Sequence, residues 1–430
     1  MSIADFSGRV RPDACPGALQ VHEAADGPLA RVRLPGGAVS AAQLRELADC
    51  ATDLGSGVIE LTSRANVQVR GLRSPTAFAE RMAFVGLLPS PAHERIRNIV
   101  ASPLSGRGPA GLADTQPLVE ALDRALCACP RLAGLPGRFL FALDDGSGDV
   151  VGLGADVTFA ACAVGTGRLL LAGSDAGLSL RVETAVSYMI AAAEAFLDER
   201  DSDGEAQRDS TAWRIGELVD GAARIAARLG GVTTDGSPSA QEVRHAGVAE
   251  QRDGRVALEA VVPLGRLTAA QARAIATADP GAIDASVPVE PGVAVRLTPW
   301  RTVVFLDLSP TDADRVARLL DAAGLVTDPA SPWVGVTACT GRPGCAKALA
   351  DVREDARRWV ADRDGPTAVP VHWAGCERRC GLPRGPVIQM VATPDGYVPT
   401  PDGYVATPDG YVATPDGYVA TANRYQERQQ

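Results

Sequence analysis

Short apolar stretches that lead through a glycine turn into an alanine-rich segment occur twice along the chain, at residues 30–34 and 256–262. Apolar runs of this length with a turn behind them predict β-strands. Ser40 and Thr268 follow the two turns, where a hydroxyl side chain caps the first turn of a helix. The pattern therefore predicts the same strand–turn–helix unit in both places.

Two further matches extend this repeat. Residues 58–69 and 295–305 each show two β-segments broken by a polar tip, and residues 98–102 and 335–339 each show one more short strand. Three matching features in the same order indicate an internal duplication. We therefore expect an α+β fold in which a strand–helix–strand unit and a mixed α/β unit each occur twice.

The join between the two copies is polar and acidic at residues 198–211, which predicts a surface linker. Residues 212–229 follow with apolar side chains at spacings of three and four, which predicts an amphipathic helix. Further on, His372 stands at the end of the apolar stretch 368–371, where we expect it to be packed or hydrogen-bonded.

The C-terminal tail is repetitive. Thr-Pro-Asp-Gly-Tyr-Val occurs four times at a period of seven residues between Thr393 and Ala420. Pro-Asp-Gly favours a turn and Tyr-Val favours a strand. We expect the first copy to form a final hairpin that corresponds to residues 139–146 of the first half, and the other copies to form an appendage without a buried role.

Length and charge limit the function. At 430 residues the chain is long enough for more than one domain, and its net charge of −10 argues against binding to nucleic acid or anionic membranes. No run approaches the roughly 18 to 20 apolar residues of a membrane helix, and the first residues do not resemble a signal peptide. With nine cysteines expected to be reduced, the predicted location is the cytoplasm.

Four of the nine cysteines form two pairs, Cys339-x5-Cys345 and Cys376-x3-Cys380. Four thiolates suit either a tetrahedral zinc ion or a [4Fe-4S] cluster. The five-residue gap, with its proline and glycine, is wider than an ordinary zinc knuckle and favours the cluster. Structural zinc and four unpaired cysteines remain the alternatives.

This cysteine signature resembles that of the sirohaem-dependent nitrite and sulfite reductase superfamily, and the continuation Cys380-Gly381-Leu382-Pro383 resembles its precorrin-3B synthase branch. The resemblance extends from about residue 20 to about residue 398. It implies an internally duplicated fold, with two ferredoxin-like half-domains and two mixed α/β cluster-domain halves around a pseudo-two-fold axis and a tetrapyrrole in the central cleft.

The repeat and the resemblance together predict seven segments. They are an N-terminal extension (1–19), ferredoxin-like half-domain 1 (20–85), a first cluster-fold half without cluster ligands (86–200), a linker with the amphipathic helix (201–245), ferredoxin-like half-domain 2 (246–328), the [4Fe-4S]-binding half (329–398) and the heptad tail (399–430). Ser102 of the first half stands where the second half has Cys339, so only one half is expected to hold a cluster.

The resemblance also implies the site residues. Residues 62–68 resemble the T-x-R-x-x-x-Q segment of the reductases, and residues 97–100 resemble their R-N-V segment; both bring an arginine to the cleft. The implied catalytic residues are Arg64, Asn66, Arg97 and Asn98, the implied tetrapyrrole-binding residues are Arg64, Gln68, Arg97, Arg138 and Arg378, and the implied metal ligands are Cys339, Cys345, Cys376 and Cys380. Arginine suits the carboxylate rim of a tetrapyrrole because its planar fork binds carboxylates bidentately.

The sequence departs from the reductases at two positions. Where sulfite reductases have L-P-x-K-F-K, residues 135–140 retain a basic residue at Arg138 but have an apolar one at Leu140. Arg378 replaces the asparagine common between the last two cysteines. Reduction of a small oxyanion needs dense positive charge at the reacting centre, so the loss of one basic residue disfavours that reaction.

The precorrin-3B synthase branch implies an O2-dependent monooxygenase that hydroxylates precorrin-3A and closes a γ-lactone, in aerobic cobalamin biosynthesis. Its implied cofactors are the [4Fe-4S] cluster and a mononuclear non-haem iron, with sirohaem only if the chain is a reductase. No dinucleotide-binding glycine motif is found, so electrons are expected from NADH through a separate reductase or from a ferredoxin. The alternatives are a sirohaem-dependent ferredoxin nitrite or sulfite reductase and a non-catalytic [4Fe-4S] electron-transfer protein.

Overall fold

The computed structural model describes residues 13, 15–202, 212–234, 245–278, 295–401, 405–407 and 410–412. The chain divides into two compact units: residues 1–23, 27–262 and 266–327 form the first, and residues 24–26, 263–265 and 328–430 form the second. Both ferredoxin-like halves and the first α/β half therefore lie in the first unit, and the cysteine pairs lie in the second. The other predicted boundaries stay predictions.

Two five-stranded sheets in the first unit exchange one strand each. The first has the order β1-β2-β5-β4-β13, and the second has the order β11-β12-β15-β14-β3. Their strands are β1 (His22–Ala24), β2 (Gly27–Val32), β3 (Ala38–Val39), β4 (Val58–Leu61), β5 (Val67–Val69), β11 (Gly247–Glu250), β12 (Val256–Val261), β13 (Arg266–Thr268), β14 (Val295–Leu297) and β15 (Thr302–Leu308). Because each half gives its strand after the glycine turn to the other sheet, the duplication predicted from the sequence is confirmed.

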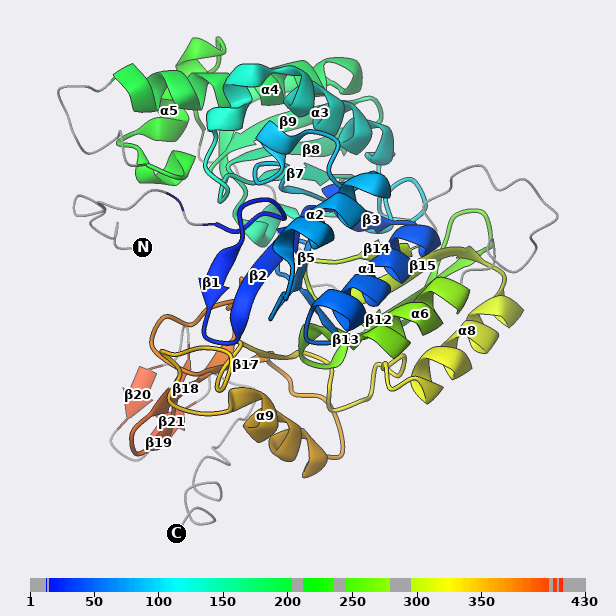
Figure 1. The fold of residues 1–430 in the computed structure, drawn as a ribbon. Coiled ribbons are helices and arrows are strands. Elements are labelled where there is room, and N and C mark those ends of the chain that lie inside the picture. The colour runs from blue at the N-terminus through cyan, green and yellow to red at the C-terminus, as the bar shows by residue number, and fades with distance from the viewer. Residues whose placement is uncertain are drawn as a thin grey trace. The chain divides into compact units, whose positions relative to one another are not determined.

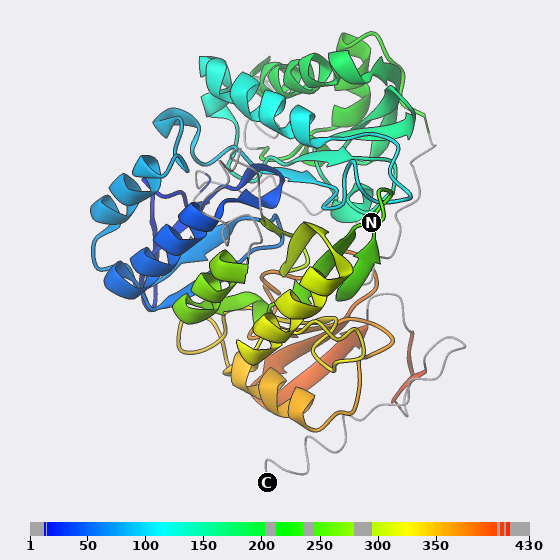
Figure 2. The same ribbon diagram turned by 90° about the vertical axis from the view of Figure 1, so that its right-hand side faces the viewer.

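Helices α1 (Ala41–Leu54), α6 (Ala269–Ala278) and α8 (Pro310–Ala322) lie side by side against these sheets, with α2 (Pro75–Phe84) next to α1 (Figures 1 and 2). Ser40 caps α1 as predicted, because its hydroxyl accepts the Gln43 N–H at 3.1 Å and the Gln43 side chain accepts the Ser40 N–H at 3.0 Å. Thr268 and Gln271 repeat the arrangement ahead of α6. Such a box satisfies two otherwise unpaired donors.

The third sheet of the first unit has the order β10-β9-β8-β7-β6. Strands β6 (Ile99–Ala101), β7 (Phe141–Asp144) and β8 (Val157–Ala163) run parallel, and β9 (Thr166–Leu171) and β10 (Ser174–Arg181) are antiparallel. Helices α3 (Gln116–Ala128) and α4 (Val182–Ser202) pack on it over a core that includes Phe139, Phe141 and Phe196. The chain also makes short 3-10 turns at Pro35–Gly37, Pro91–His93, Pro130–Gly134, Val151–Leu153, Ile215–Glu217 and Pro263–Gly265.

The second unit contains a four-stranded sheet of the same pattern. Strands β16 (Val336–Ala338), β17 (Val371–Ala374) and β18 (Ile388–Thr393) are parallel, and β19 (Gly396–Pro401) is antiparallel to β18. Helix α9 (Val352–Ala361) packs on one face of this sheet over Trp373, whose ring lies edge-on to those of Trp359 and Tyr397. Strands β20 (Val405–Thr407) and β21 (Gly410–Val412) form a separate two-stranded sheet. The strand orders β6–β9 and β16–β19 match, as the duplication requires.

Some predicted elements differ from the structure. The predicted helix over 212–229 begins only at Gly221, as α5 (Gly221–Arg228), because Asp220 before it has a left-handed backbone (φ 51°) that a continuous helix does not allow. The linker predicted from residue 198 starts later, since α4 continues to Ser202; residues 203–211 lie outside the described residues.

Two further predictions concern the second sheet. His372 lies inside β17 and not at a strand end. The first tail copy forms the β18–β19 hairpin as predicted. Its counterpart in the first half is β8–β9, not residues 139–146, because β7 is the central parallel strand of the three.

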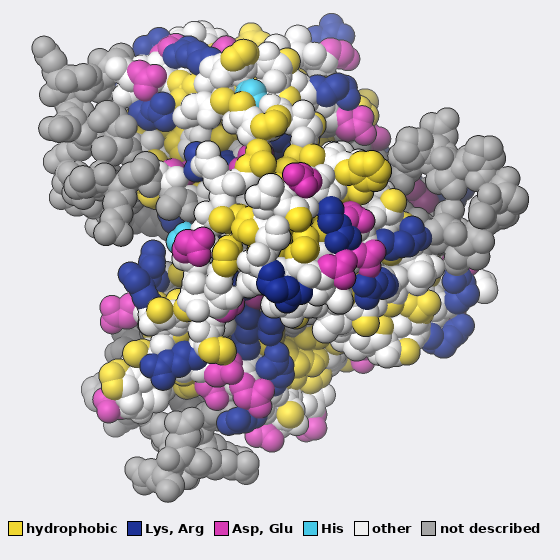
Figure 3. Space-filling model, viewed as in Figure 1, with side chains coloured by type: hydrophobic (Ala, Val, Ile, Leu, Met, Phe, Trp, Pro, Cys, Tyr) yellow, Lys and Arg dark blue, Asp and Glu magenta, His cyan; other side chains and the backbone are white. Residues whose placement is uncertain are grey.

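Acidic and basic side chains are interspersed over the helical side of the first unit (Figure 3). Arg81 pairs with Glu46 and Asp53, and Arg273 pairs with Asp49 at 2.6 Å. Exposed pairs of this kind contribute little to stability. Within the described ranges, no helix combines the length and the hydropathy needed to cross a bilayer.

Candidate functional site

The sheet of the second unit positions one cysteine of each pair. Strands β16 and β17 are parallel neighbours, so their carboxyl ends meet at one edge of the sheet, where Cys339 follows β16 and Cys376 follows β17 after Gly375. The Cys339 N–H donates to the Trp373 carbonyl at 2.9 Å, and the Gly375 N–H donates to the Cys339 Sγ at 3.2 Å. The two motifs separated in sequence are thus joined by one hydrogen bond between backbone groups and one from a backbone N–H to the Cys339 sulfur.

The loop that carries Cys345 folds back onto the same edge. Leu349 N–H donates to the Gly375 carbonyl at 2.8 Å, and the Cys345 N–H donates to the Gly341 carbonyl at 2.9 Å. Gly341 has φ 65°, and a Cβ at this position would lie 2.7 Å from a Val352 methyl group. A glycine is therefore required for the loop to turn here.

The thiols of this edge affect one another. Burial raises the pKa of the Cys339 thiol, and the neighbouring Cys380 and Cys345 raise it further, while the N–H groups of Gly375 and Gly341 lower it. Cys339, Cys345 and Cys380 are therefore close enough to interact electrostatically. A bound cation or cluster would remove this mutual repulsion of thiolates.

The four thiols are donors of the type that a [4Fe-4S] cluster takes. Among the residues that the structure describes, no three His, Cys, Asp or Glu side chains converge on one point as a metal ion needs. The N–H group aimed at Cys339 Sγ is the kind of hydrogen bond that tunes cluster thiolates. Since no such group of side chains is found in the described part of the chain, the structure shows no ligand set for the expected mononuclear iron there.

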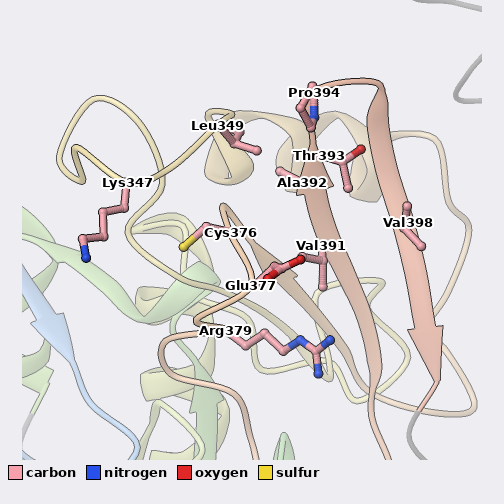
Figure 4. A pocket seen from close by; sticks show the side chains of 10 residues that line it. All are labelled: Lys347, Leu349, Cys376, Glu377, Arg379, Val391, Ala392, Thr393, Pro394 and Val398. Atoms are coloured by element: carbon pink, nitrogen blue, oxygen red, sulfur yellow. The ribbon is translucent and has the colours of Figure 1, made fainter. Parts of the chain in front are cut away.

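A pocket of about 390 Å³ lies between the Cys376 loop and the β18–β19 hairpin (Figure 4). Cys376, Glu377 and Arg379 line one side, and Lys347 comes from the loop of the other cysteine pair. Arg378, predicted to bind a tetrapyrrole, is exposed in the same loop. Cys376 thus lines a pocket together with two basic side chains, Lys347 and Arg379.

In the first unit, a pair of asparagines joins three of the predicted motifs. Asn98 donates to the carbonyls of Gly137 at 2.9 Å and Phe139 at 3.2 Å, and accepts from Asn66 at 3.1 Å. Asn66 also accepts the Leu34 N–H at 2.9 Å. The structure thus brings together residues 62–68, 97–100 and 135–140. Both amides are buried and hydrogen-bonded to protein, so they hold the loops together instead of facing a cleft as expected.

Arg64 lies next to this junction, and its Nη1 makes a long hydrogen bond of 3.4 Å to the Gly137 carbonyl. Burial, with a further contribution from Arg214, lowers the pKa of Arg64 to about 9. Asp156 lies near Arg64 but forms its ion pair with Arg214, and no carboxylate of the described residues pairs directly with Arg64. A partly dehydrated guanidinium in this state favours the binding of an anion. This environment supports the predicted role of Arg64.

Arg33 was not predicted as a site residue. It is 1 % exposed, its Nη2 contacts Cys15 Sγ at 3.5 Å, and its Nη1 has no hydrogen-bond partner among the described residues. Burial, with Arg31 nearby, lowers the pKa of Arg33 to about 10. The sequence could have indicated this residue, because Arg33 stands in the apolar stretch 30–34 and a charged residue in a core-facing strand is rare unless it is paired.

The remaining predicted residues have other partners. Arg97 makes a two-fold ion pair with Asp123 at 2.6 and 2.7 Å and donates to the Leu87 carbonyl, so a substrate role would require this pair to open. Gln68 bridges Arg31 and Glu60 at 2.9 and 2.7 Å. Arg138 is exposed and lies 5.0 Å over the Trp213 ring. Arg64 and Arg138 are thus better placed than Arg97 to bind an anionic substrate.

The first-half counterpart of the Cys339 position contains no thiol. Ser102 follows β6 as Cys339 follows β16; its hydroxyl donates to Asp149 at 2.6 Å and accepts the Asp145 N–H at 3.1 Å. Burial, and to a lesser extent the nearby Asp144 and Asp145, raises the pKa of Asp149 to about 7, while the Ser102 hydrogen bond lowers it. The polar cluster replaces the cysteines in this half.

Comparisons with known proteins agree with this architecture. A family model described as the nitrite/sulfite reductase ferredoxin-like half domain matches residues 22–76. The chain is 29 % identical to a precorrin-3B synthase of Sinorhizobium sp. over 90 % of this chain and 82 % of the relative, and 27 % identical to a ferredoxin–nitrite reductase of Synechococcus elongatus over 83 % and 74 %.

Similarity extends to a sulfite reductase (ferredoxin) of Mycolicibacterium paratuberculosis, at 26 % identity over 81 % of this chain and 67 % of the relative. Among solved structures, the NirA protein of Mycobacterium tuberculosis matches with a TM-score of 0.69 and 23 % identity, over 87 % of this chain and 73 % of that one. The predicted duplicated fold is thereby confirmed.

Proposed function

We propose that the chain, which is similar to oxidoreductases of the nitrite and sulfite reductase type, catalyses the reaction of a precorrin-3B synthase. The substrate is precorrin-3A, which is hydroxylated with one atom of O2 and closed to a γ-lactone. The observation that carries this proposal is the similarity to a precorrin-3B synthase over 90 % of the chain, together with the environment of Leu140.

Leu140 occupies the position at which the sequence departs from L-P-x-K-F-K. Its side chain is 3 % exposed and packs with Val100, Ala142, Val150 and Ala155. A lysine here would bury an ammonium group among aliphatic side chains without a partner, which is strongly unfavourable. Position 140 therefore carries no cation where L-P-x-K-F-K has its second lysine, a feature that favours a large tetrapyrrole as substrate over a small oxyanion.

The chain's own residues have two tasks in this proposal. Arg64 and Arg138 bind substrate carboxylates, and the Asn66–Asn98 pair keeps their two loops in register. Cys339, Cys345, Cys376 and Cys380 hold the [4Fe-4S] cluster, which when bound passes single electrons from an external donor. NADH through a reductase, or a ferredoxin, supplies those electrons.

A ferredoxin-dependent nitrite or sulfite reductase is the second candidate, favoured by the 27 % identity to the nitrite reductase of Synechococcus elongatus. The two candidates differ in the tetrapyrrole, which is a resident sirohaem in the second and a transient substrate in the first.

Anaerobic purification followed by absorption spectroscopy and analysis of iron and labile sulfide distinguishes them. The proposal expects about four sulfides per chain and no sirohaem bands, and stoichiometric sirohaem overturns it. Complementation of a cobalamin auxotroph then tests the site. Arg64→Ala is expected to abolish rescue, whereas Arg131→Ala, which removes an exposed ion pair with Asp198, leaves rescue intact. Full rescue by Arg64→Ala would remove that residue from the site.

A further inference from the structure

Residues 212–218 are held in place by the core of the β6–β10 sheet. Every third side chain of this segment is buried in that core: Ala212, Ile215 and Leu218. Trp213 and Arg214 lie between them and are only partly buried. Because the backbone on both sides is anchored, these two side chains have fixed starting points. Neither belongs to a motif that the sequence indicated as part of the site.

Arg214 is bound to a buried carboxylate. Its Nε donates to Asp156 Oδ2 at 2.6 Å, and its Nη2 donates to the Gly154 carbonyl. Asp156 is 1 % exposed and also accepts the N–H groups of Leu140 at 2.8 Å and Ile215 at 2.9 Å. Burial raises the pKa of this carboxyl, whereas Arg214 and the two N–H groups lower it. The negative charge of Asp156 is therefore committed to these three donors.

Arg64 and Arg214 both keep hydrogen-bond donors unused. Within the described residues, Nη1 of Arg214 has no partner, and the Arg64 side chain makes one hydrogen bond, from its Nη1 to the Gly137 carbonyl. The two guanidinium groups are close enough for Arg214 to lower the pKa of Arg64. Since Asp156 is bound to Arg214, the charge of Arg64 is left without a direct partner in a partly buried place. Such a charge is stabilised when an anion binds.

Trp213 holds a third arginine. Arg138 is exposed, and its guanidinium carbon lies 5.0 Å from the centroid of the Trp213 ring. A cation is attracted to the face of an indole ring. This contact limits the conformations of a long, exposed side chain before a ligand arrives, which lowers the entropy cost of binding.

The three arginines meet at one loop, residues 137–140. Arg64 donates to the carbonyl at the start of the loop, Arg138 lies within it, and Arg214 is joined through Asp156 to the N–H at its end. Each guanidinium is able to bind one carboxylate bidentately. The arrangement therefore suits a ligand with several carboxylates, because a single small anion would leave most of this positive charge without a partner.

We propose that Trp213 and Arg214 belong to the substrate site. Arg214 and Arg64 together bind one carboxylate of a polycarboxylate tetrapyrrole, and Trp213 is a positioning residue that orients Arg138 towards a second carboxylate. The tetrapyrrole as ligand rests on the proposed function, whereas the preference for several carboxylates follows from the three arginines. The site thereby extends from the motifs of the first half to the segment that follows α4.

Fluorescence titration of the anaerobically purified chain with uroporphyrin, a porphyrin with a carboxylate-rich rim, measures binding without turnover. Arg214→Met is expected to weaken binding about tenfold, through loss of one charge-assisted contact. Arg214→Lys should give an intermediate affinity, because lysine keeps the charge and loses the planar fork. Trp213→Ala should weaken binding as well, whereas Trp213→Phe, which keeps an aromatic face, should retain most of it.

Arg168→Met is the matched control. It also removes an arginine from a buried carboxylate, since Arg168 pairs with Asp175 at 2.7 Å and Asp175 is 2 % exposed. Urea unfolding is expected to show a loss of stability in both Arg168→Met and Arg214→Met, while only Arg214→Met loses affinity for uroporphyrin. Wild-type affinity in Arg214→Met, or an equal loss of affinity in both variants, would overturn the proposal.

Two further outcomes separate this proposal from the proposed reaction. A wild type that binds uroporphyrin no better than protoporphyrin, which has fewer carboxylates, would overturn the role of the arginines. Tight uroporphyrin binding without turnover of precorrin-3A would support that role and count against the reaction alone. If the purified chain already contains sirohaem, the variants are compared by sirohaem content: a lower content in Arg214→Met than in Arg168→Met supports the proposal, and equal contents overturn it.

Discussion

Asp149 is expected to make the folded state less stable as pH rises towards neutrality. Burial of its carboxyl, with Asp144 and Asp145 nearby, raises its pKa from 3.8 to about 7. A carboxyl with a raised pKa holds its proton more tightly in the folded state than in the unfolded one. Stability therefore falls between about pH 4 and pH 7, and the full penalty is present above pH 7.

The size of the effect follows from the shift. The change from 3.8 to about 7 is about 3 pK units, and at about 1.4 kcal/mol per unit it corresponds to about 4 kcal/mol as an upper limit. Asp149→Asn removes the titration but retains an oxygen that can accept the Ser102 hydroxyl. The variant is therefore expected to match the wild type near pH 4 and to exceed its stability by up to about 4 kcal/mol at pH 8.

Urea unfolding followed by circular dichroism at pH 4 and pH 8 measures this difference. Asp253→Asn is the matched control, because Asp253 is exposed and its substitution should leave the pH dependence of the wild type unchanged. If Asp149→Asn gives the same stability difference at both pH values, Asp149 is not the protonated group, and the reasoning fails.

Three further substitutions test how the loops are held. Asn98→Ala should destabilise the first unit by about 2 kcal/mol, because the carbonyls of Gly137 and Phe139 lose the Asn98 amide as a donor and only the long Arg64 bond to Gly137 remains; an unchanged urea midpoint would contradict this. Asp123→Ala should cost about 3 kcal/mol by leaving the Arg97 guanidinium, 5 % exposed, without its partner, and thermal melting checks it. Ser40→Ala should cost about 1 kcal/mol through loss of the helix cap, whereas Ser40→Asp should retain stability in the same melt.

The fold was largely predictable because the same pattern of strands and helices occurs twice in the sequence. The strand pairs at 58–69 and 295–305 and the capping hydroxyls of Ser40 and Thr268 appear in the structure where the repeat placed them. The exchange of β3 and β13 between the sheets was not predictable, because strand partners far apart in sequence leave no trace in local periodicity. The helix over 212–229 was misjudged because apolar spacing does not reveal the left-handed residue Asp220.

The site was predictable in its residues more than in their roles. Sequence spacing paired the cysteines, and the parallel strands β16 and β17 supply the reason that Cys339 and Cys376, one from each pair, reach one sheet edge. The motifs drew attention to Asn66 and Asn98, but only the structure shows that their side-chain amides hydrogen-bond to backbone groups and to each other. Arg33 was not predicted because its unusual feature is its burial, and the burial of a single charged residue cannot be predicted from the sequence of one strand.

Turnover of precorrin-3A under O2 labelled with the heavy isotope, with reductant and analysis by mass spectrometry, tests the proposed function most directly. The account predicts a product that carries one labelled oxygen atom, and no conversion by the Cys380→Ser variant. Unchanged precorrin-3A, together with reduction of nitrite or sulfite by the same preparation, would contradict it and assign the chain to the reductases.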